Sequence, residues 1–76
     1  MNQSEIIRAV MKEKGYTYAA LAKKLGYDNP SMISGKLLRG NGMRTDWFLR
    51  MLNAMDCDII IKDRIGSKKT WLFDEE

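Results

Sequence analysis

The chain has 76 residues, of which 45% are hydrophobic and 30% charged, a composition that suits one small globular domain with a modest core. Its formal net charge is +3 at pH 7, and it contains no histidine and a single cysteine. These counts, and the lack of any phosphate-loop, nucleophile or metal-ligand spacing, argue against an enzyme, a metal site and a cofactor. Cys57 has no second cysteine to pair with, which fits a reducing compartment. The chain has no signal-peptide core and no membrane-length apolar run, so we expect a cytoplasmic protein without a membrane partner.

The charge is unevenly distributed along the chain. Residues 1–55 hold nine Lys and Arg against four Asp and Glu, a balance of +5, whereas residues 56–76 hold four against six, a balance of −2. The basic excess of the first segment favours a polyanionic partner. A solvated lysine surface explains the same count, and charge alone does not choose between the two.

The first helix is expected from residue 2 or 4 to residue 14. Asn2 followed three residues later by Glu5 matches a capping box, and Gly15 is placed to end the helix. Its apolar stripe consists of Ile6, Ile7, Val10 and Met11.

A second, amphipathic helix is expected over residues 18–25, capped by Thr17, with Leu21 and Leu25 on its inward face. Gly26 follows, at a position where a helix end favours a residue that adopts positive φ. Two short helices joined by such a turn form a helix-turn-helix, whose second helix can enter the major groove of DNA.

The third helix is expected over residues 30–38, capped by Asp28 or Asn29, with Pro30 in its first turn. Its outward surface consists of small polar side chains and Gly35, a combination with low helix propensity. Such a surface is poorly suited to a purely structural helix, but it lets the helix lie close to another surface.

The fourth helix is expected from residue 44 or 45 to residue 55, with Thr45 as its N-cap. Its core stripe consists of Phe48, Met51, Leu52 and Met55. Across the helices, the side chains expected to be nearly buried are Leu21, Leu25, Ile33, Leu37, Phe48 and Leu52.

The C-terminal segment changes character. Residues 58–62 contain three consecutive isoleucines and predict a strand, residues 65–68 a turn, and residues 69–73 a second strand. A lone hairpin is marginal in water, so this one is expected to pack on the helices, on another copy of the chain, or on both. The elements together predict a mainly α fold. A compact bundle of four or five helices occupies residues 1–56, and a C-terminal β-hairpin occupies residues 57–76 of the same compact unit.

The segment from Thr17 to Met55 resembles the lambda-repressor/Cro-like helix-turn-helix family of phage and bacterial transcription regulators. The matching residues are Thr17, Leu21, Ala22, Leu25, Gly26, Ile33, Leu37, Arg39, Gly40, Phe48, Leu52, Ala54 and Met55. Tyr18 stands where that family commonly has glutamine, and residues 27–32 fit with one extra residue. The resemblance implies a repressor-like helix-turn-helix bundle, and in similar small regulators the C-terminal strands often help to form a dimer.

The leading functional hypothesis is a sequence-specific regulator of transcription that binds double-stranded DNA with the third helix in the major groove. The residues expected to read bases are Asn29, Ser31, Met32, Ser34, Gly35 and Lys36. Asparagine can address adenine, lysine guanine, and serine either. The residues expected to hold the DNA backbone are Thr17, Tyr18, Lys23, Arg39 and Arg44.

We expect a homodimer through the hairpin, because an isolated hairpin leaves strand edges and apolar side chains uncovered. The expected interface residues are Ile59, Ile61, Trp71 and Phe73. Folding of the hairpin back onto the fourth helix is the alternative. The rival function is a protein-interaction module, such as an antitoxin or an inhibitor of a phage or host protein. Trp47, Trp71 and Phe73 are its exposed candidates, since aromatic residues are favoured at interfaces.

Overall fold

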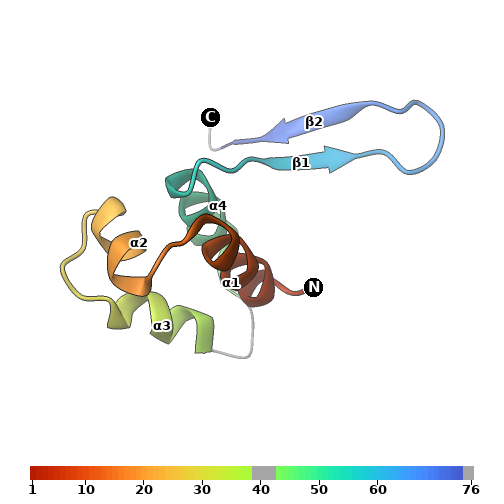
Figure 1. Ribbon diagram of the computed structural model, residues 1–76. Helices are drawn as coiled ribbons and strands as arrows, with labels where there is room; N and C mark the ends of the chain where they lie inside the picture. Colours follow the sequence, from red (N-terminus) through yellow and green to blue (C-terminus); the bar gives the residue numbers. More distant parts are fainter. Residues whose placement is uncertain (39–42, 75–76) are drawn as a thin grey trace.

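The computed structural model describes residues 1–38 and 43–74. Four helices are followed by one two-stranded antiparallel hairpin in these residues, which confirms the prediction of a mainly helical chain with a C-terminal hairpin (Figure 1). The helices are α1 Gln3–Lys14, α2 Tyr18–Lys24, α3 Ser31–Leu38 and α4 Thr45–Ala54. The strands are β1 Ile59–Lys62 and β2 Thr70–Phe73. No helix of the described residues is long and apolar enough to cross a membrane.

The ends of α1 are fixed as its sequence predicts. The Glu5 amide donates to the Asn2 side chain at 2.8 Å, and the Asn2 amide donates to the Glu5 carboxylate at 3.2 Å, so both halves of the capping box are present. Gly15 ends the helix in the left-handed region at φ 74°.

Side-chain caps also start the next two helices. The Thr17 hydroxyl accepts a hydrogen bond from the Ala20 amide at 3.1 Å, and the Asn29 side chain accepts one from the Ser31 amide at 3.0 Å. Asn29, rather than Asp28, therefore holds the start of α3. Gly26 adopts φ 88° in the turn between α2 and α3, a backbone conformation that L side chains rarely adopt.

The predicted N-cap of α4 is wrong. Thr45 is the first helical residue, and the N-cap is Arg44, which makes no side-chain capping bond. The carboxylate of Asp46 supplies the charge that a helix N-terminus favours, because it accepts a hydrogen bond from the Trp47 amide at 2.9 Å and pairs with the Arg44 guanidinium at 3.1 Å.

The helices enclose one hydrophobic core. Its buried side chains, among the residues described, are Ile7, Met11, Leu21, Ala22, Ile33, Leu37, Leu49, Met51, Leu52 and Met55. Burial is thus confirmed for four of the six side chains predicted to be nearly buried. It is wrong for Leu25 and Phe48, which pack against the core but are only half-buried. Leu25 is the C-cap residue of α2, where fewer neighbours surround a side chain. Leu49 is a buried residue that the predicted stripe omitted.

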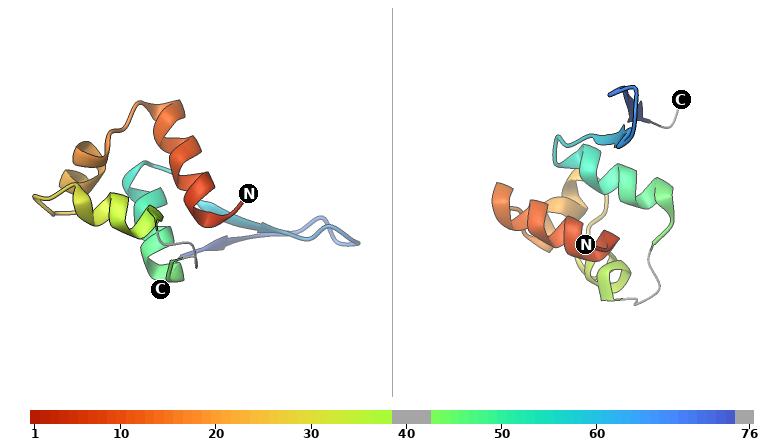
Figure 2. Two further views of the ribbon diagram at one scale, coloured as in Figure 1. Left: turned by 90° about the horizontal axis from the view of Figure 1, so that it is seen from below. Right: turned by 90° about the vertical axis from the view of Figure 1, so that its right-hand side faces the viewer.

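The hairpin projects away from the helices, and the described chain measures 45 × 25 × 24 Å along its principal axes (Figures 1 and 2). Of its strand residues, Ile59 packs against the helical core. The hairpin leaves α4 through Asp56, which has a left-handed backbone at φ 60°. Its distal turn is closed by the Asp63 carboxylate, which accepts hydrogen bonds from the Ile65 amide at 3.0 Å and the Ser67 hydroxyl at 2.9 Å.

The strand register places the predicted interface residues on one face. Ile59 pairs with Phe73 and Ile61 with Trp71, and alternate residues of a strand share a face. Ile60 and Leu72 lie on the opposite face. Ile60, Ile61, Trp71 and Leu72 are all between 52% and 62% exposed. The expectation that both faces are covered is therefore not met within the protomer, and this hairpin does not fold back onto α4.

Candidate nucleic-acid interface

The outward face of α3 carries only small or neutral side chains. Ile33 and Leu37 are buried on the inward side of the helix, where α3 packs against α2. Ser31, Gly35 and Leu38 are exposed on the other side, and Leu38 is 76% exposed. A Cβ atom built on Gly35 would meet nothing within 4 Å. This face is therefore open to a flat or grooved partner, and Gly35 is not needed for packing within the protomer.

The residues predicted to read bases fall into two groups. Ser31 and Gly35 are exposed on the open face of α3. Asn29 is also exposed, but its carbonyl oxygen caps the helix. Ser34 is half-buried, and its hydroxyl donates to the Ser31 carbonyl at 3.2 Å. The structure thus brings these four residues to one end and one side of the helix.

The second group, Met32 and Lys36, packs within the protomer. Met32 lies against the hydrophobic core. The Lys36 ammonium lies 4.1 Å from the centre of the Trp47 ring, and the Arg50 guanidinium lies 5.6 Å from the same centre. Tyr27 stacks on this ring at 5.9 Å in a tilted arrangement. Trp47 is therefore half-buried between α3, α4 and the turn, rather than exposed as expected. Phe73 is half-buried as well, and only Trp71 of the three aromatic candidates is exposed.

The residues predicted to hold the DNA backbone are spread around α2 and the start of α4. Thr17, Tyr18 and Lys23 are exposed on or beside α2. Arg44 is exposed as well, although it pairs with Asp46. Arg39 lies outside the described residues.

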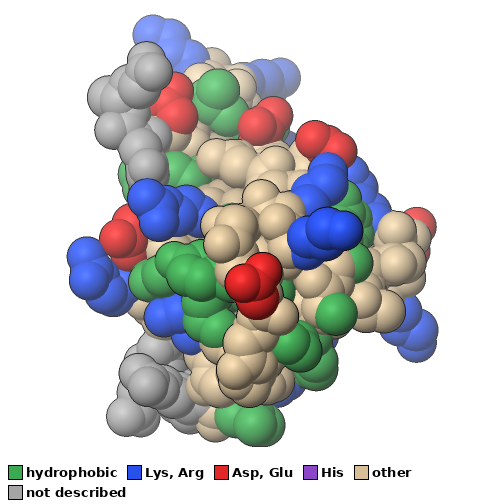
Figure 3. Space-filling model, turned by 90° about the vertical axis from the view of Figure 1, so that its left-hand side faces the viewer, with side chains coloured by type: hydrophobic (Ala, Val, Ile, Leu, Met, Phe, Trp, Pro, Cys, Tyr) green, Lys and Arg blue, Asp and Glu red, His purple; other side chains and the backbone are tan. Residues whose placement is uncertain are grey.

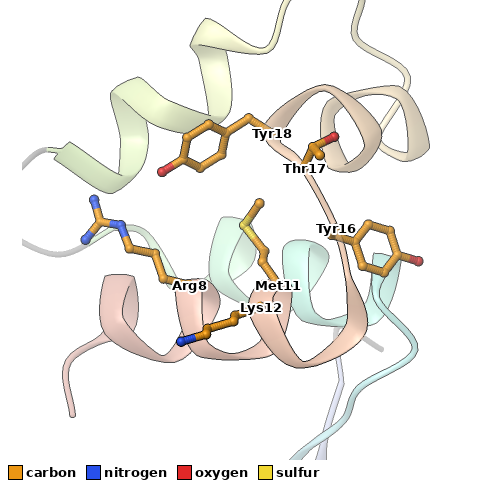
Figure 4. A pocket seen from close by; sticks show the side chains of 6 residues that line it. All are labelled: Arg8, Met11, Lys12, Tyr16, Thr17 and Tyr18. Atoms are coloured by element: carbon orange, nitrogen blue, oxygen red, sulfur yellow. The ribbon is translucent and has the colours of Figure 1, made fainter.

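A groove between α1 and the start of α2 adds positive charge to this part of the molecule. It has a volume of about 370 Å³ and is lined by Arg8, Met11, Lys12, Tyr16, Thr17 and Tyr18 (Figure 4). The Arg8 side chain extends toward α3, where it donates to the Leu37 carbonyl at 3.4 Å, and the Tyr18 ring lies on the facing wall (Figure 4). Sequence reasoning missed Arg8 and Lys12. Their i, i+4 spacing, which places both cations on one face of α1, is the signal that could have found them.

Lys24, the last residue of α2, interacts with Tyr16. The Lys24 ammonium lies 5.7 Å from the centre of the Tyr16 ring, and a hydrogen bond with the Tyr16 hydroxyl raises the pKa of Lys24. Figure 3 shows the end of the molecule that carries the α2–α3 turn: lysine and arginine side chains border a surface of apolar groups, small polar groups and backbone, with an acidic side chain near its centre. The lysine and arginine side chains at its border suit contact with phosphates.

The described residues contain no group of three or more His, Cys, Asp or Glu side chains that could hold a metal ion. Comparisons of the chain with protein-family models, with curated proteins and with solved structures found no match.

Proposed function

We propose that this chain is a sequence-specific, double-stranded-DNA-binding regulator of transcription of the phage-repressor type, acting in the cytoplasm, with α2 and α3 as its helix-turn-helix. The observation that carries the proposal is the open face of α3. The helix is anchored by Ile33 and Leu37 and presents Ser31, Gly35 and the apolar side chain of Leu38 to solvent, with no charged side chain among these three. A helix that enters the major groove must approach base edges closely, and small side chains permit that approach.

The charges of the helix pair support an anionic partner. Neither α2 nor α3 contains an aspartate or glutamate, whereas together they contain Lys23, Lys24 and Lys36. Arg8 and Arg44 lie on neighbouring elements and extend the positive surface. Phosphate contacts of this kind fix the register of a protein on DNA, and hydroxyl or apolar groups on the open face of α3 then discriminate between bases.

The functional unit that we propose is a homodimer held together by the hairpin. Ile61 and Trp71 form a cross-strand pair on the face that also carries Ile59 and Phe73, and both are more than half exposed in the protomer. A two-fold dimer presents two copies of α3 to DNA and reads an approximately palindromic site.

A protein-interaction module is the second candidate, and the exposed hairpin favours it. Ile60, Leu72 and Trp71 offer apolar surface of the kind that interfaces use. Because this surface lies on the hairpin, whereas the open face lies on α3, the two candidate roles are testable separately.

Selection of bound sequences from a random pool of duplex DNA tests the proposal directly. The parent chain is expected to enrich a short consensus, and Gly35→Glu is expected to abolish enrichment because it places an acid on the open face of α3 without meeting other atoms. Asn53→Glu adds the same charge at an exposed position of α4 and is the matched control. If neither the parent nor Asn53→Glu enriches a consensus, the proposal that the chain reads DNA is contradicted. Unchanged enrichment by Gly35→Glu contradicts the role of α3.

A further inference from the structure

Charge is segregated along the length of the hairpin. Residues 62–69, which form its distal turn and the strand ends beside it, hold four Lys and Arg against one Asp. Residues 56–61 and 70–74, which form the end nearest the helices, hold three Asp and no cation. The one acid of the distal end, Asp63, is occupied by hydrogen bonds within its own turn. The hairpin therefore has a basic distal end and an acidic proximal end.

Between these two ends the hairpin is apolar and uncovered. Ile61 and Trp71 are exposed on one face, and Ile60 and Leu72 on the other. Exposed apolar pairs of this kind, rimmed by charge, are typical of an interaction site. The charged ends restrict which occupant fits, because a complementary partner needs an acid at the distal end and a cation at the proximal end.

A second copy of the same hairpin meets this requirement in one orientation only. When two hairpins lie side by side in the same direction, the basic ends meet each other and the acidic ends meet each other. When they lie in opposite directions, each basic distal end meets an acidic proximal end, and two-fold symmetry forms this contact twice. Like charges placed opposite one another destabilise pairing, whereas opposite charges support it.

We propose that the chain dimerises through hairpins that pack head to tail, with the basic end of each against the acidic end of the other and the Ile61 and Trp71 face buried between them. This inference rests on the homodimer of the proposed function and adds its orientation. The apolar middle supplies most of the affinity, and the charged ends select the direction and exclude the parallel arrangement.

Charge reversal distinguishes the two orientations. Arg64→Glu with Lys69→Glu changes the charge of residues 62–69 from +3 to −1, and Asp58→Lys with Asp74→Lys changes that of residues 56–61 and 70–74 from −3 to +1. Analytical ultracentrifugation is expected to show that each pair of substitutions weakens dimerisation by about tenfold, since both symmetry-related contacts change sign. The four substitutions together are expected to restore the parent's dissociation constant to within about threefold. Lys12→Glu with Arg50→Glu changes the net charge by −4, as the distal pair does, at exposed positions outside the hairpin, and its dissociation constant for dimerisation is the matched control for that pair.

Chemical cross-linking reports the orientation with a substitution at only one end of the hairpin in each variant. In a Cys57→Ser background, Ile65→Cys places a thiol at the 84% exposed tip and Asp58→Cys places one near the helices. A short thiol-specific cross-linker is expected to join the two variants when they are mixed, and to leave the tip variant alone as uncoupled chains. Efficient tip-to-tip coupling overturns the proposal. So does a combined charge variant that dimerises less well than either pair, or a parent chain that stays monomeric. DNA selection by the parent judges the proposed function independently of these results.

Discussion

The Lys36 ammonium lies 4.1 Å from the centre of the Trp47 ring, so a lysine predicted to read bases is held against α4 in the free protein. A cation over an indole ring is stabilised by roughly 0.5–1 kcal/mol at exposed sites, little enough for a guanine to displace it. In the proposed DNA complex, Lys36 is therefore expected to exchange the ring for a base.

Lys36 is expected to leave Trp47 when the protein binds its specific site. In a Trp71→Phe background Trp47 is the one remaining tryptophan, and its fluorescence is expected to change on addition of specific DNA. Lys36→Ala is expected to abolish this change and to weaken specific binding by about 1–3 kcal/mol more than binding to random DNA. Equal weakening of both kinds of DNA indicates a phosphate contact instead.

Leu37 and Leu38 provide a matched pair for the anchoring of α3. Leu37 is buried, and Leu37→Ala is expected to lower the free energy of unfolding by about 2–5 kcal/mol, measured by urea denaturation. Leu38 is its exposed neighbour in the same helix, and Leu38→Ala is expected to change stability by less than about 0.5 kcal/mol. Similar losses for both variants indicate that the helix is rotated relative to the structure described.

DNA affinity is expected to fall steeply with salt, because the proposed contacts on α2 and at the start of α4 are mainly to phosphates. For roughly six phosphates contacted per dimer, the logarithm of the binding constant against that of the salt concentration has a slope near −5. Titrations of a fluorescent duplex at several salt concentrations measure it, and a flat response argues against a polyanion partner.

The faces of the hairpin differ in their expected effect on assembly. Ile61→Lys places a charge in the face that we propose is buried between protomers, and sedimentation is expected to show a monomer. Ile60→Lys makes the same change on the opposite face at the neighbouring position and is expected to leave the dimer intact. The reverse result assigns the interface to the Ile60 and Leu72 face.

The distal turn is expected to loosen in acid. Hydrogen bonds from the Ile65 amide and the Ser67 hydroxyl lower the pKa of Asp63 below its ordinary value of 3.8. A lowered folded-state pKa means that the carboxylate stabilises the turn above its ordinary pKa. The stabilisation is lost as the pH falls through the folded value. NMR titration of the Ile65 amide is expected to report this loss below about pH 4, and Asp63→Asn is expected to remove it.

The helices were predictable where local chemistry determines them. Asn2 with Glu5, Thr17 and Gly26 act over three or four residues, and the structure confirms each of them. The prediction of Thr45 as the N-cap was wrong. At this helix end the carboxylate of Asp46, one residue later, accepts a hydrogen bond from the Trp47 amide.

The site was less predictable than the fold, because its geometry depends on contacts that are distant in sequence. The pairing of Lys36 with Trp47, and the reach of Arg8 to the carbonyl of Leu37, join different elements, and no local pattern encodes them. Helical periodicity placed Lys36 outside the inward stripe but did not show that its long side chain bends toward α4.

In the proposed dimer, the exit from α4 sets the spacing of the two copies. Asp56 holds a left-handed backbone that costs an L residue roughly 1–2 kcal/mol, and the Lys14 ammonium donates to the carbonyl of the preceding residue, Met55, at 2.6 Å. The direction of the hairpin is thus determined at two consecutive residues that belong neither to the open face of α3 nor to the strands. A substitution at this junction is expected to change the angle between α3 and the hairpin while leaving both intact. In the proposed dimer, the separation of the two α3 helices, and with it that of the DNA half-sites, can therefore change without any change in the residues on the open face.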